Sequence, residues 1–255
     1  MSTWKVWDKE QAYGDLFFKR ATGELPEMES SKALAKIIQS YLEDGDKIGD
    51  IGCGGGHYLR SLDKRATKKF HYVGIDQTAY YIEKANEAFS KKNNENKLRL
   101  TTVFRQGDIF SIPLMDNEVD VAICNNVLLH LPSIEKPIEE LLRIANKTII
   151  IRALIGDHTL RVKQIHKPEE FDENGEPSKF HFHNIYSKAY IESILVKNNV
   201  TKYHFFEDTD FESNAFNNGD NYLGEKPDNL THVHNGMQVN TYIIQPWTFL
   251  VIEKS

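Results

Sequence analysis

The 255-residue chain has few cysteines, no long apolar run and no excess of basic residues. Its two cysteines, Cys53 and Cys124, fall at the ends of predicted strands, a poor place for a structural disulfide, so both are expected to be reduced. No run of about 20 apolar residues is present, and residues 1–8 lack the apolar core of a signal peptide. The net charge of −6 argues against nucleic acid as the main substrate. We therefore expect a cytoplasmic protein with neither membrane nor nucleic acid as a partner.

A glycine-rich turn at residues 46–56 is the feature around which the rest of the chain is organised. Apolar residues alternate through Ile48 and Ile51, four glycines follow within five residues, and a helical pattern begins at Tyr58. Glycine suits such a turn because it accepts positive φ and lets backbone N–H groups approach a ligand at a helix N-terminus. The pattern predicts a strand, a tight turn and a helix that together cradle a nucleotide-type cofactor.

The glycine spacing separates two classes of nucleotide binder. The dinucleotide fingerprint requires glycine at its first, third and sixth positions, and counting from Gly52 the sixth position is His57. The spacing therefore disfavours an oxidoreductase that uses a nicotinamide cofactor. The alternative to a cofactor-binding turn is a glycine-rich turn that binds no ligand.

The sequence Asp50-Ile-Gly52-Cys53-Gly54 resembles the first motif of the class I S-adenosylmethionine-dependent methyltransferases. In that family the glycines line the methionine and ribose part of the cofactor, and an acid at the position of Asp50 helps to hold the methionine amino group. The resemblance implies that these residues, Cys53 included, bind S-adenosylmethionine and release S-adenosylhomocysteine.

The ends of the next three predicted strands carry further residues that match this family. Asp76, followed by Gln77, ends a buried-type strand 24 residues after Gly52, where a carboxylate can accept two hydrogen bonds from ribose hydroxyls. By resemblance, Asp108 accepts from the adenine amino group and Ile109 packs on the ring. Asn125 would lie beside the methionine portion. The order of these elements supports the resemblance more than any one of them.

Five strands alternating with helices predict an α/β fold, a doubly wound and mostly parallel seven-stranded sheet. We expect N-terminal lid helices over residues 1–45 and the cofactor-binding domain over residues 46–255. Polar insertions at about 156–182 and 208–236 should form a cap. Ser30 and Ser31 offer N-caps for a helix, and residues 237–253 should form a final strand or hairpin.

Histidine is the natural general base near neutral pH, and the chain has ten. Candidate bases are His130, His158 and His183, and the candidate acceptor-binding residues are Arg152, His181 and Tyr186. Arg152 can bind an anionic acceptor or pair with an insertion carboxylate. Two His-x-His pairs, at 181–183 and 232–234, have the spacing of a metal site on a strand, but hydrogen-bonded histidines are the preferred reading and we expect no metal.

These features predict methyl transfer from S-adenosylmethionine to a small polar acceptor, at oxygen rather than nitrogen. A polar, histidine-rich cap favours a sugar, a nucleotide-sugar or a phosphorylated precursor over a greasy acceptor. The alternatives are a small-molecule N-methyltransferase, a nicotinamide-dependent oxidoreductase and a non-catalytic cofactor-binding protein. The sequence leaves the oligomeric state open.

Overall fold

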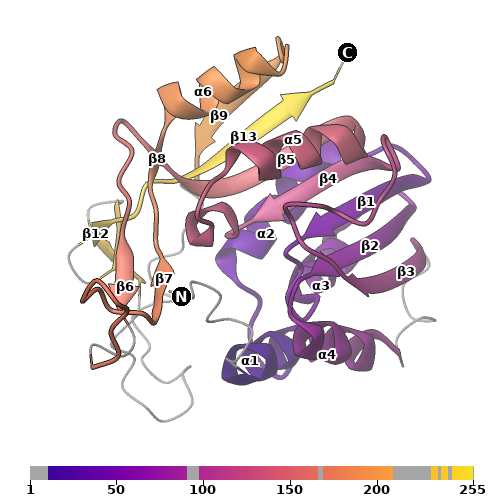
Figure 1. The fold of residues 1–255 in the computed structure, drawn as a ribbon. Helices are drawn as coiled ribbons and strands as arrows, with labels where there is room; N and C mark the ends of the chain where they lie inside the picture. Colours follow the sequence, from indigo (N-terminus) through magenta and orange to yellow (C-terminus); the bar gives the residue numbers. More distant parts are fainter. Residues whose placement is uncertain are drawn as a thin grey trace.

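A mostly parallel sheet organises the molecule (Figure 1). The computed structural model describes residues 11–90, 98–165, 169–208, 231–234, 237–240 and 243–254, with the backbone alone for residues 231–244. The main sheet follows the order β3-β2-β1-β4-β5-β13-β9. Its strands are β1 (Asp46–Ile51), β2 (Phe70–Asp76), β3 (Arg99–Gln106), β4 (Val119–Asn125), β5 (Ala145–Gly156), β9 (Tyr203–Glu207) and β13 (Trp247–Glu253).

Strands β1 to β5 run parallel, and β13 lies antiparallel between β5 and β9. Strand β8 (Tyr186–Ser187) pairs with the end of β5. This arrangement confirms the predicted doubly wound, mostly parallel sheet. Because parallel strands end at one edge, the chain after β1, β2 and β4 converges there.

Helices cover both faces of the sheet (Figure 1). Helices α2 (Glu29–Ile37), α3 (His57–Arg65) and α4 (Ala79–Ser90) pack on one face, and α1 (Gln11–Thr22) contacts α3 and α4. Helices α5 (Glu135–Ile144) and α6 (Lys188–Lys197) pack on the other. Successive strand residues serve opposite faces, so that Ile150 faces α2 and α3 while Ile149 and Ile151 face α5 and α6.

The helix for which Ser30 and Ser31 were predicted as N-caps starts earlier in the structure. Helix α2 begins at Glu29 with Met28 as its N-cap, so the prediction that Ser30 or Ser31 caps it was wrong. Both serines are buried and bond to other groups instead: Ser31 donates to the Met28 carbonyl at 2.8 Å, and Ser30 accepts from Tyr58 Oη at 2.9 Å. Ser31 Oγ also lies 2.8 Å from Ser61 Oγ of α3, so both hydroxyls are occupied by contacts between α2 and α3.

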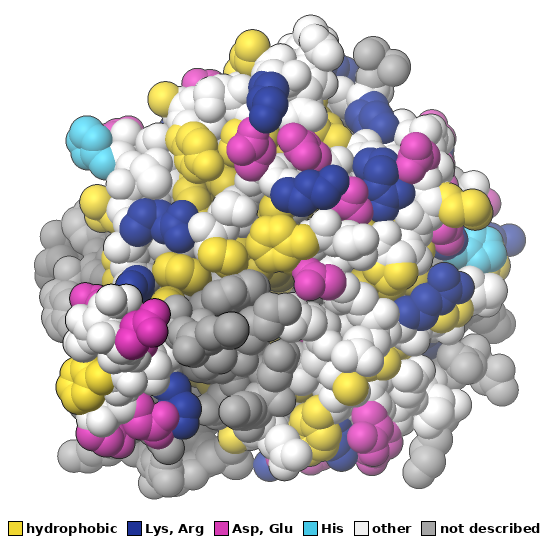
Figure 2. Space-filling view, in the orientation of Figure 1, with side chains coloured by type: hydrophobic (Ala, Val, Ile, Leu, Met, Phe, Trp, Pro, Cys, Tyr) yellow, Lys and Arg dark blue, Asp and Glu magenta, His cyan; other side chains and the backbone are white. Residues whose placement is uncertain are grey.

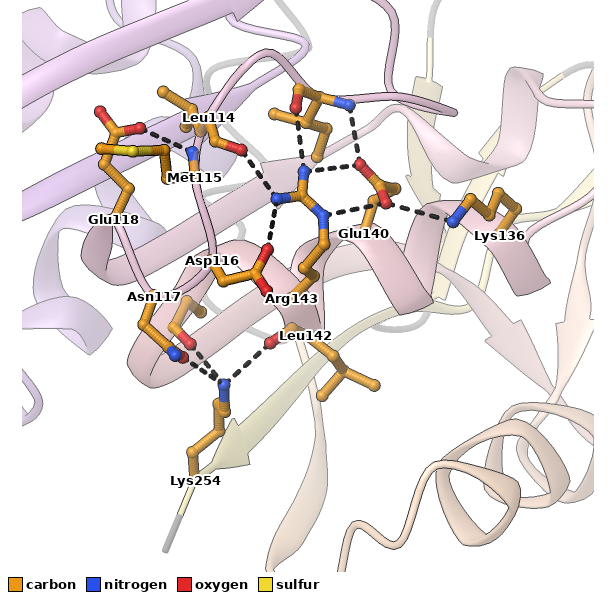
Figure 3. A network of polar contacts seen from close by, with 12 residues as sticks. Leu114, Met115, Asp116, Asn117, Glu118, Lys136, Glu140, Leu142, Arg143 and Lys254 are labelled. Atoms are coloured by element: carbon orange, nitrogen blue, oxygen red, sulfur yellow. Dashed lines mark hydrogen bonds and ion pairs between the residues drawn. The ribbon is translucent and has the colours of Figure 1, made fainter.

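The connection from β3 to β4 departs from regular strand and helix alternation. Residues 107–118 contain no helix, and α5 holds this loop instead (Figure 3). Arg143 of α5 donates to the carbonyls of Ile112 and Leu114 at 2.9 and 2.7 Å, and Glu140 accepts from Ile112 N at 2.9 Å. Side chains therefore satisfy the backbone groups that a helix would have satisfied.

Two small sheets lie beside the main one (Figure 1). Strands β6 (Lys163–Ile165) and β7 (Phe180–Phe182) form an antiparallel pair within the first insertion. Strands β10 (Thr231–His234), β11 (Met237–Asn240) and β12 (Ile243–Ile244) form a separate sheet. Residues 237–253 are therefore not one strand or hairpin, and that prediction was wrong. Pro246 separates β12 from β13 because proline has no N–H for a ladder. Most of the second insertion lies outside the described residues.

Basic and acidic side chains are interspersed on the face shown in Figure 2, where neither sign forms a continuous field. Such a surface differs from the basic stripe that a nucleic-acid-binding domain presents. None of the described helices combines the length and the apolar character needed to span a bilayer.

Candidate functional site

The glycine turn after β1 has a backbone that only glycine accommodates well. Gly52, Gly54 and Gly56 have φ values of 81°, 55° and 77°. A Cβ on Gly52 would lie 2.3 Å from Cγ2 of Val127, which follows β4. The turn is thus closely packed against the chain after β4, and any side chain at Gly52 would push the two apart.

Asp50 is a buried carboxyl directly before this turn. It is 2% exposed, and Tyr72 Oη of β2 donates to its Oδ2 at 2.5 Å. Burial raises the pKa of Asp50 to about 7, the Tyr72 hydrogen bond opposes this, and the Asp76 charge adds to it. A cation placed beside this group would offset the cost of ionising it.

Asp76 joins the turn to the end of β2. Its Oδ2 accepts from Gly54 N at 2.8 Å and its Oδ1 accepts from Thr78 N at 2.9 Å. The carboxylate therefore fixes the turn and the start of α4 at once. A ribose contact by Asp76 stays a prediction, as does the role of Gln77, whose carbonyl accepts from Gln106 Nε2 at 2.8 Å.

Asp108 and Ile109 begin the loop after β3, where the resemblance placed the adenine contacts. Asp108 Oδ1 accepts from Phe110 N at 2.9 Å, which is a local turn, and Ile109 is buried. Both residues lie beyond the carboxyl end of β3, and the bond from Gly107 N to the Asp76 carbonyl at 2.9 Å brings the start of this loop next to the end of β2. Their adenine contacts stay a prediction.

Asn125, the last residue of β4, has a side chain with unused hydrogen-bonding capacity. It is 6% exposed, and neither Oδ1 nor Nδ2 has a partner among the described residues. Leaving such a group unpaired costs about 1–3 kcal/mol, so an unpaired buried amide at a strand end indicates a ligand position. The cradle at Gly52, the buried carboxyl of Asp50 and this amide together fit an amino-acid-bearing nucleoside cofactor.

Cys53 and Cys124 are both free and buried. Burial raises the pKa of each thiol, which leaves both protonated at neutral pH. Neither is a nucleophile in this environment.

Arg152 of β5 is buried in an ion pair. It is 2% exposed, its Nε donates to Asp208 Oδ2 at 2.7 Å, and its Cζ lies 4.0 Å from the centroid of the Trp247 ring. Its Nη1 donates to Asn126 Oδ1 at 2.6 Å. The sequence left two roles open for Arg152, binding an anionic acceptor or pairing with a carboxylate of an insertion. In the structure Arg152 forms the ion pair, with Asp208 at the start of the second insertion.

Three histidines meet where the first insertion packs on η3 (Leu128–His130), the 3₁₀ turn after β4. The His130 ring centroid lies 6.0 Å from that of His181 and 6.1 Å from that of His183. His130 Nδ1 donates to the Phe182 carbonyl at 2.9 Å, and Gln245 Nε2 donates to His183 Nε2 at 3.0 Å. Burial lowers the pKa of His130 to about 3 and lowers the pKa of His183, so both rings are neutral.

The other candidates differ in exposure and in partners. His158 is exposed in the loop after β5. Tyr186 is 1% exposed in the core, and its Oη donates to the Leu131 carbonyl at 3.3 Å. The pair His232 and His234 lies outside the side chains that the structure describes. Within the described residues, no three His, Cys, Asp or Glu side chains form a group able to hold a metal ion.

Sequence reasoning missed residues whose contacts are made only by the folded chain. Tyr72 reaches Asp50 from the neighbouring strand, and Asp208 and Gln245 come from distant segments. Asn126 has a φ of 61°, and a run of two asparagines after a strand is a usable signal for that conformation. His57 and Phe17 stack on each other, as described below.

Comparison with known proteins agrees with this geometry. A family model described as a methyltransferase domain matches residues 42–208. The crystal structure of a SAM-dependent methyltransferase from Methanosarcina mazei has the same fold, with a TM-score of 0.57 at 15% identity over 86% of this chain and 96% of that chain.

Two curated relatives match in sequence over less than half of this chain. An uncharacterized methyltransferase of Schizosaccharomyces pombe is 30% identical over 105 residues, which are 41% of this chain and 37% of that protein. A sterol 24-C-methyltransferase of Gibberella zeae is 28% identical over 106 residues, which are 42% of this chain and 26% of that protein. In both cases the match spans well under two thirds of the relative.

Proposed function

The chain belongs to the methyltransferase-domain family, whose methyl donor is S-adenosylmethionine, and we propose that it methylates an oxygen of a small polar acceptor. The observation that carries the proposal is the cluster of His130, His181 and His183 between η3 and the first insertion. A sugar, a nucleotide-sugar or a phosphorylated precursor offers the hydroxyls that such a lining binds.

Methyl transfer from a sulfonium needs alignment more than acid or base catalysis, because the leaving group is already good. An alcohol acceptor differs in that its proton must leave, and a neutral imidazole can take it. The bond from His130 Nδ1 to the Phe182 carbonyl places the proton on Nδ1, so Nε2 is the atom through which His130, the candidate base, would take the proton. Because burial lowers the pKa of His130 to about 3, the bound acceptor would have to raise that pKa for the transfer to occur. The bond from Gln245 to His183 Nε2 leaves the proton on Nδ1, so His183 is a candidate donor to the acceptor. His181 is proposed to line the same site.

Two of the predicted acceptor-binding residues have partners within the protein. Arg152 and Tyr186 have internal partners and would position the acceptor pocket rather than touch the acceptor. Charges of both signs alternate on the face in Figure 2, in keeping with a partner other than nucleic acid.

An acceptor panel tests the proposal with purified protein and S-adenosylmethionine carrying a labelled methyl group. The panel holds sugars, sugar phosphates and nucleotide-sugars, each beside its amino-sugar counterpart, and a sterol. Label on the hydroxyl compounds supports the proposal. Label on the amino compounds alone would establish the N-methyltransferase alternative, and cofactor binding without turnover on any acceptor would favour the non-catalytic one.

His183→Ala tests the histidine cluster. We expect turnover on the accepted substrate to fall at least tenfold, because the substitution removes the Nδ1–H group that would donate a hydrogen bond to the acceptor. The Kd for S-adenosylhomocysteine should stay the same, because the predicted cofactor-binding residues are unchanged. His71→Ala is the matched control, since His71 lies near the start of β2 at the opposite edge of the sheet and bonds to Thr101. Unchanged turnover in His183→Ala would remove His183 from the reaction.

A further inference from the structure

We propose that His57 binds the carboxylate of the cofactor's methionine portion, and that α1 closes over this contact through Phe17. The inference rests on the proposed function for the identity of the cofactor. His57 stands where a dinucleotide binder has its third glycine, and it is the first residue of α3.

His57 has an unused polar atom on a ring that lies beside the glycine turn. Its side chain is 8% exposed, and Nδ1 has no partner among the described residues. The ring edge faces the turn, because Cε1 lies 3.6 Å from where a Cβ on Gly54 would stand. A buried unpaired nitrogen costs free energy in the empty protein, and a ligand oxygen on the glycine turn would recover that cost.

The start of α3 favours an anion at this position. Its N-cap, Gly56, has a φ of 77° and no side chain to cap the first turn. The N–H groups of a helix start carry partial positive charge that attracts carboxylates. Asp50 provides the opposite charge on the strand side of the turn. An amino acid group, with its ammonium toward Asp50 and its carboxylate toward α3, matches this polarity.

Phe17 of α1 covers the contact. Its ring stacks on His57 with centroids 4.4 Å apart and planes 8° from parallel. Phe17 Cδ2 would lie 3.0 Å from a Cβ on Gly54, and Phe17 Cβ would lie 3.0 Å from a Cβ on Gly55. Helix α1 therefore rests directly on the glycine turn, and a larger residue at either glycine would displace it.

The charge state of His57 suits this arrangement. Burial, together with the nearby Arg20 charge of α1, lowers the pKa of His57 to about 3. The neutral ring stacks on Phe17 without burying an ion, while its Nδ1–H donates to the carboxylate. Arg20 lies close enough for its charge to act on the His57 ring, and the same positive charge would favour a carboxylate bound there.

Calorimetry with two ligands tests the proposal. S-adenosylhomocysteine carries the carboxylate, and its decarboxylated analogue lacks only that group. His57→Phe keeps the stack with Phe17 but removes the donor, so we expect about tenfold weaker binding of S-adenosylhomocysteine and unchanged binding of the analogue. His57→Asn, whose amide N–H replaces Nδ1–H, should restore part of the difference.

A measurement on the unaltered protein guards against a variant that fails to fold. With the histidines labelled with nitrogen-15, the Nδ1 resonance of His57 should move on adding S-adenosylhomocysteine and stay in place with the analogue. Equal effects of the two ligands, or no effect of either substitution, would overturn the carboxylate contact. If the unaltered protein bound neither ligand, the proposed function itself would fail.

Discussion

At the scale of single residues, Asp50 is a buried carboxyl whose ionisation costs free energy in the folded protein. Its carboxyl is buried with one hydrogen bond from Tyr72, and its pKa is raised to about 7, chiefly by burial. A raised carboxyl pKa means that the folded protein holds its proton more tightly than the unfolded chain does. Stability from this group is full below the unfolded value of 3.8 and is lost as the pH rises through 7.

Asp50→Asn should therefore make the cofactor-free protein less sensitive to pH. The amide keeps the acceptor for Tyr72 but has no proton to lose. We expect the variant to gain on the order of 3 kcal/mol of stability relative to the unaltered protein between pH 4 and pH 8. Urea unfolding at several pH values measures this difference.

Asp157→Asn is the control, because Asp157 is exposed and its substitution should leave the pH dependence unchanged. A pH profile for Asp50→Asn that parallels the unaltered protein would show that Asp50 is already solvated in solution.

At the scale of elements, α5 works as a clamp on the loop between β3 and β4 (Figure 3). Glu140 accepts from Arg143 Nη2 at 2.8 Å and from Ile112 N at 2.9 Å. Arg143 in turn donates to the Leu114 carbonyl and to Asp116. Because this loop carries Asp108 and Ile109 at its start, the clamp also sets where the proposed adenine contacts lie.

Glu140→Gln should destabilise the protein by about 2 kcal/mol at neutral pH, since it removes charge-assisted hydrogen bonds to Arg143 and Ile112. The Arg143 hydrogen bonds, helped by the one from Ile112, lower the pKa of Glu140 from 4.5 to about 2. The stability from this group is thus present above pH 4.5 and is lost as the pH falls toward 2. Thermal unfolding at pH 7 and pH 3 should show a smaller gap between the two proteins at pH 3.

The matched control is Glu87→Gln on α4, where Glu87 pairs with Lys84 and its side chain is 55% exposed. An exposed pair contributes about 0–1 kcal/mol, so little change is expected. If the Glu140→Gln protein were as stable as this control, the hydrogen bonds of Glu140 would not stabilise the loop between β3 and β4.

At the scale of the whole molecule, Arg152 joins segments that are far apart in the chain. It pairs with Asp208 after β9, stacks on Trp247 at the start of β13 and bonds to Asn126 after β4. Asn126 Nδ2 donates to Tyr58 Oη at 3.1 Å, and Tyr58 donates to Ser30. This network connects the start of the second insertion to the turn that presents Asn125.

Arg152→Met should destabilise the protein by about 3–5 kcal/mol, because it leaves the buried Asp208 carboxylate without its cation. Adding Asp208→Leu to Arg152→Met should return part of that loss, since no buried charge then remains. Denaturant unfolding of the single and double variants measures the coupling. Lys202→Met is the control, as Lys202 is 68% exposed in its pair with Glu253.

Additive losses in the double variant would show that Arg152 and Asp208 are not coupled in solution. A loss of cofactor affinity in Arg152→Met, measured with S-adenosylhomocysteine, would show in addition that the network positions Asn125.

Much of this protein was readable from local sequence. Glycines at residues 52, 54 and 56 determined the turn after β1, because positive φ is a property of single residues. Apolar runs at Ile48, Val121 and Ile150 determined the strands, and Ser187 determined the start of α6, where it accepts from Tyr190 N at 3.2 Å. Such features depend on neighbours within a few positions.

Only the tertiary structure decided which buried polar side chains have a hydrogen-bond partner within the described residues and which do not. Ser30, Arg152 and Tyr186 look like surface or site residues in the sequence, yet the fold buries each against a partner more than 25 positions away. Asn125 and His57 acquired unpaired buried atoms in the same way. Hydrogen bonding between distant segments has no local period. The sequence therefore determined the strands and the glycine turn, and packing decided which buried polar groups have a partner within the described residues.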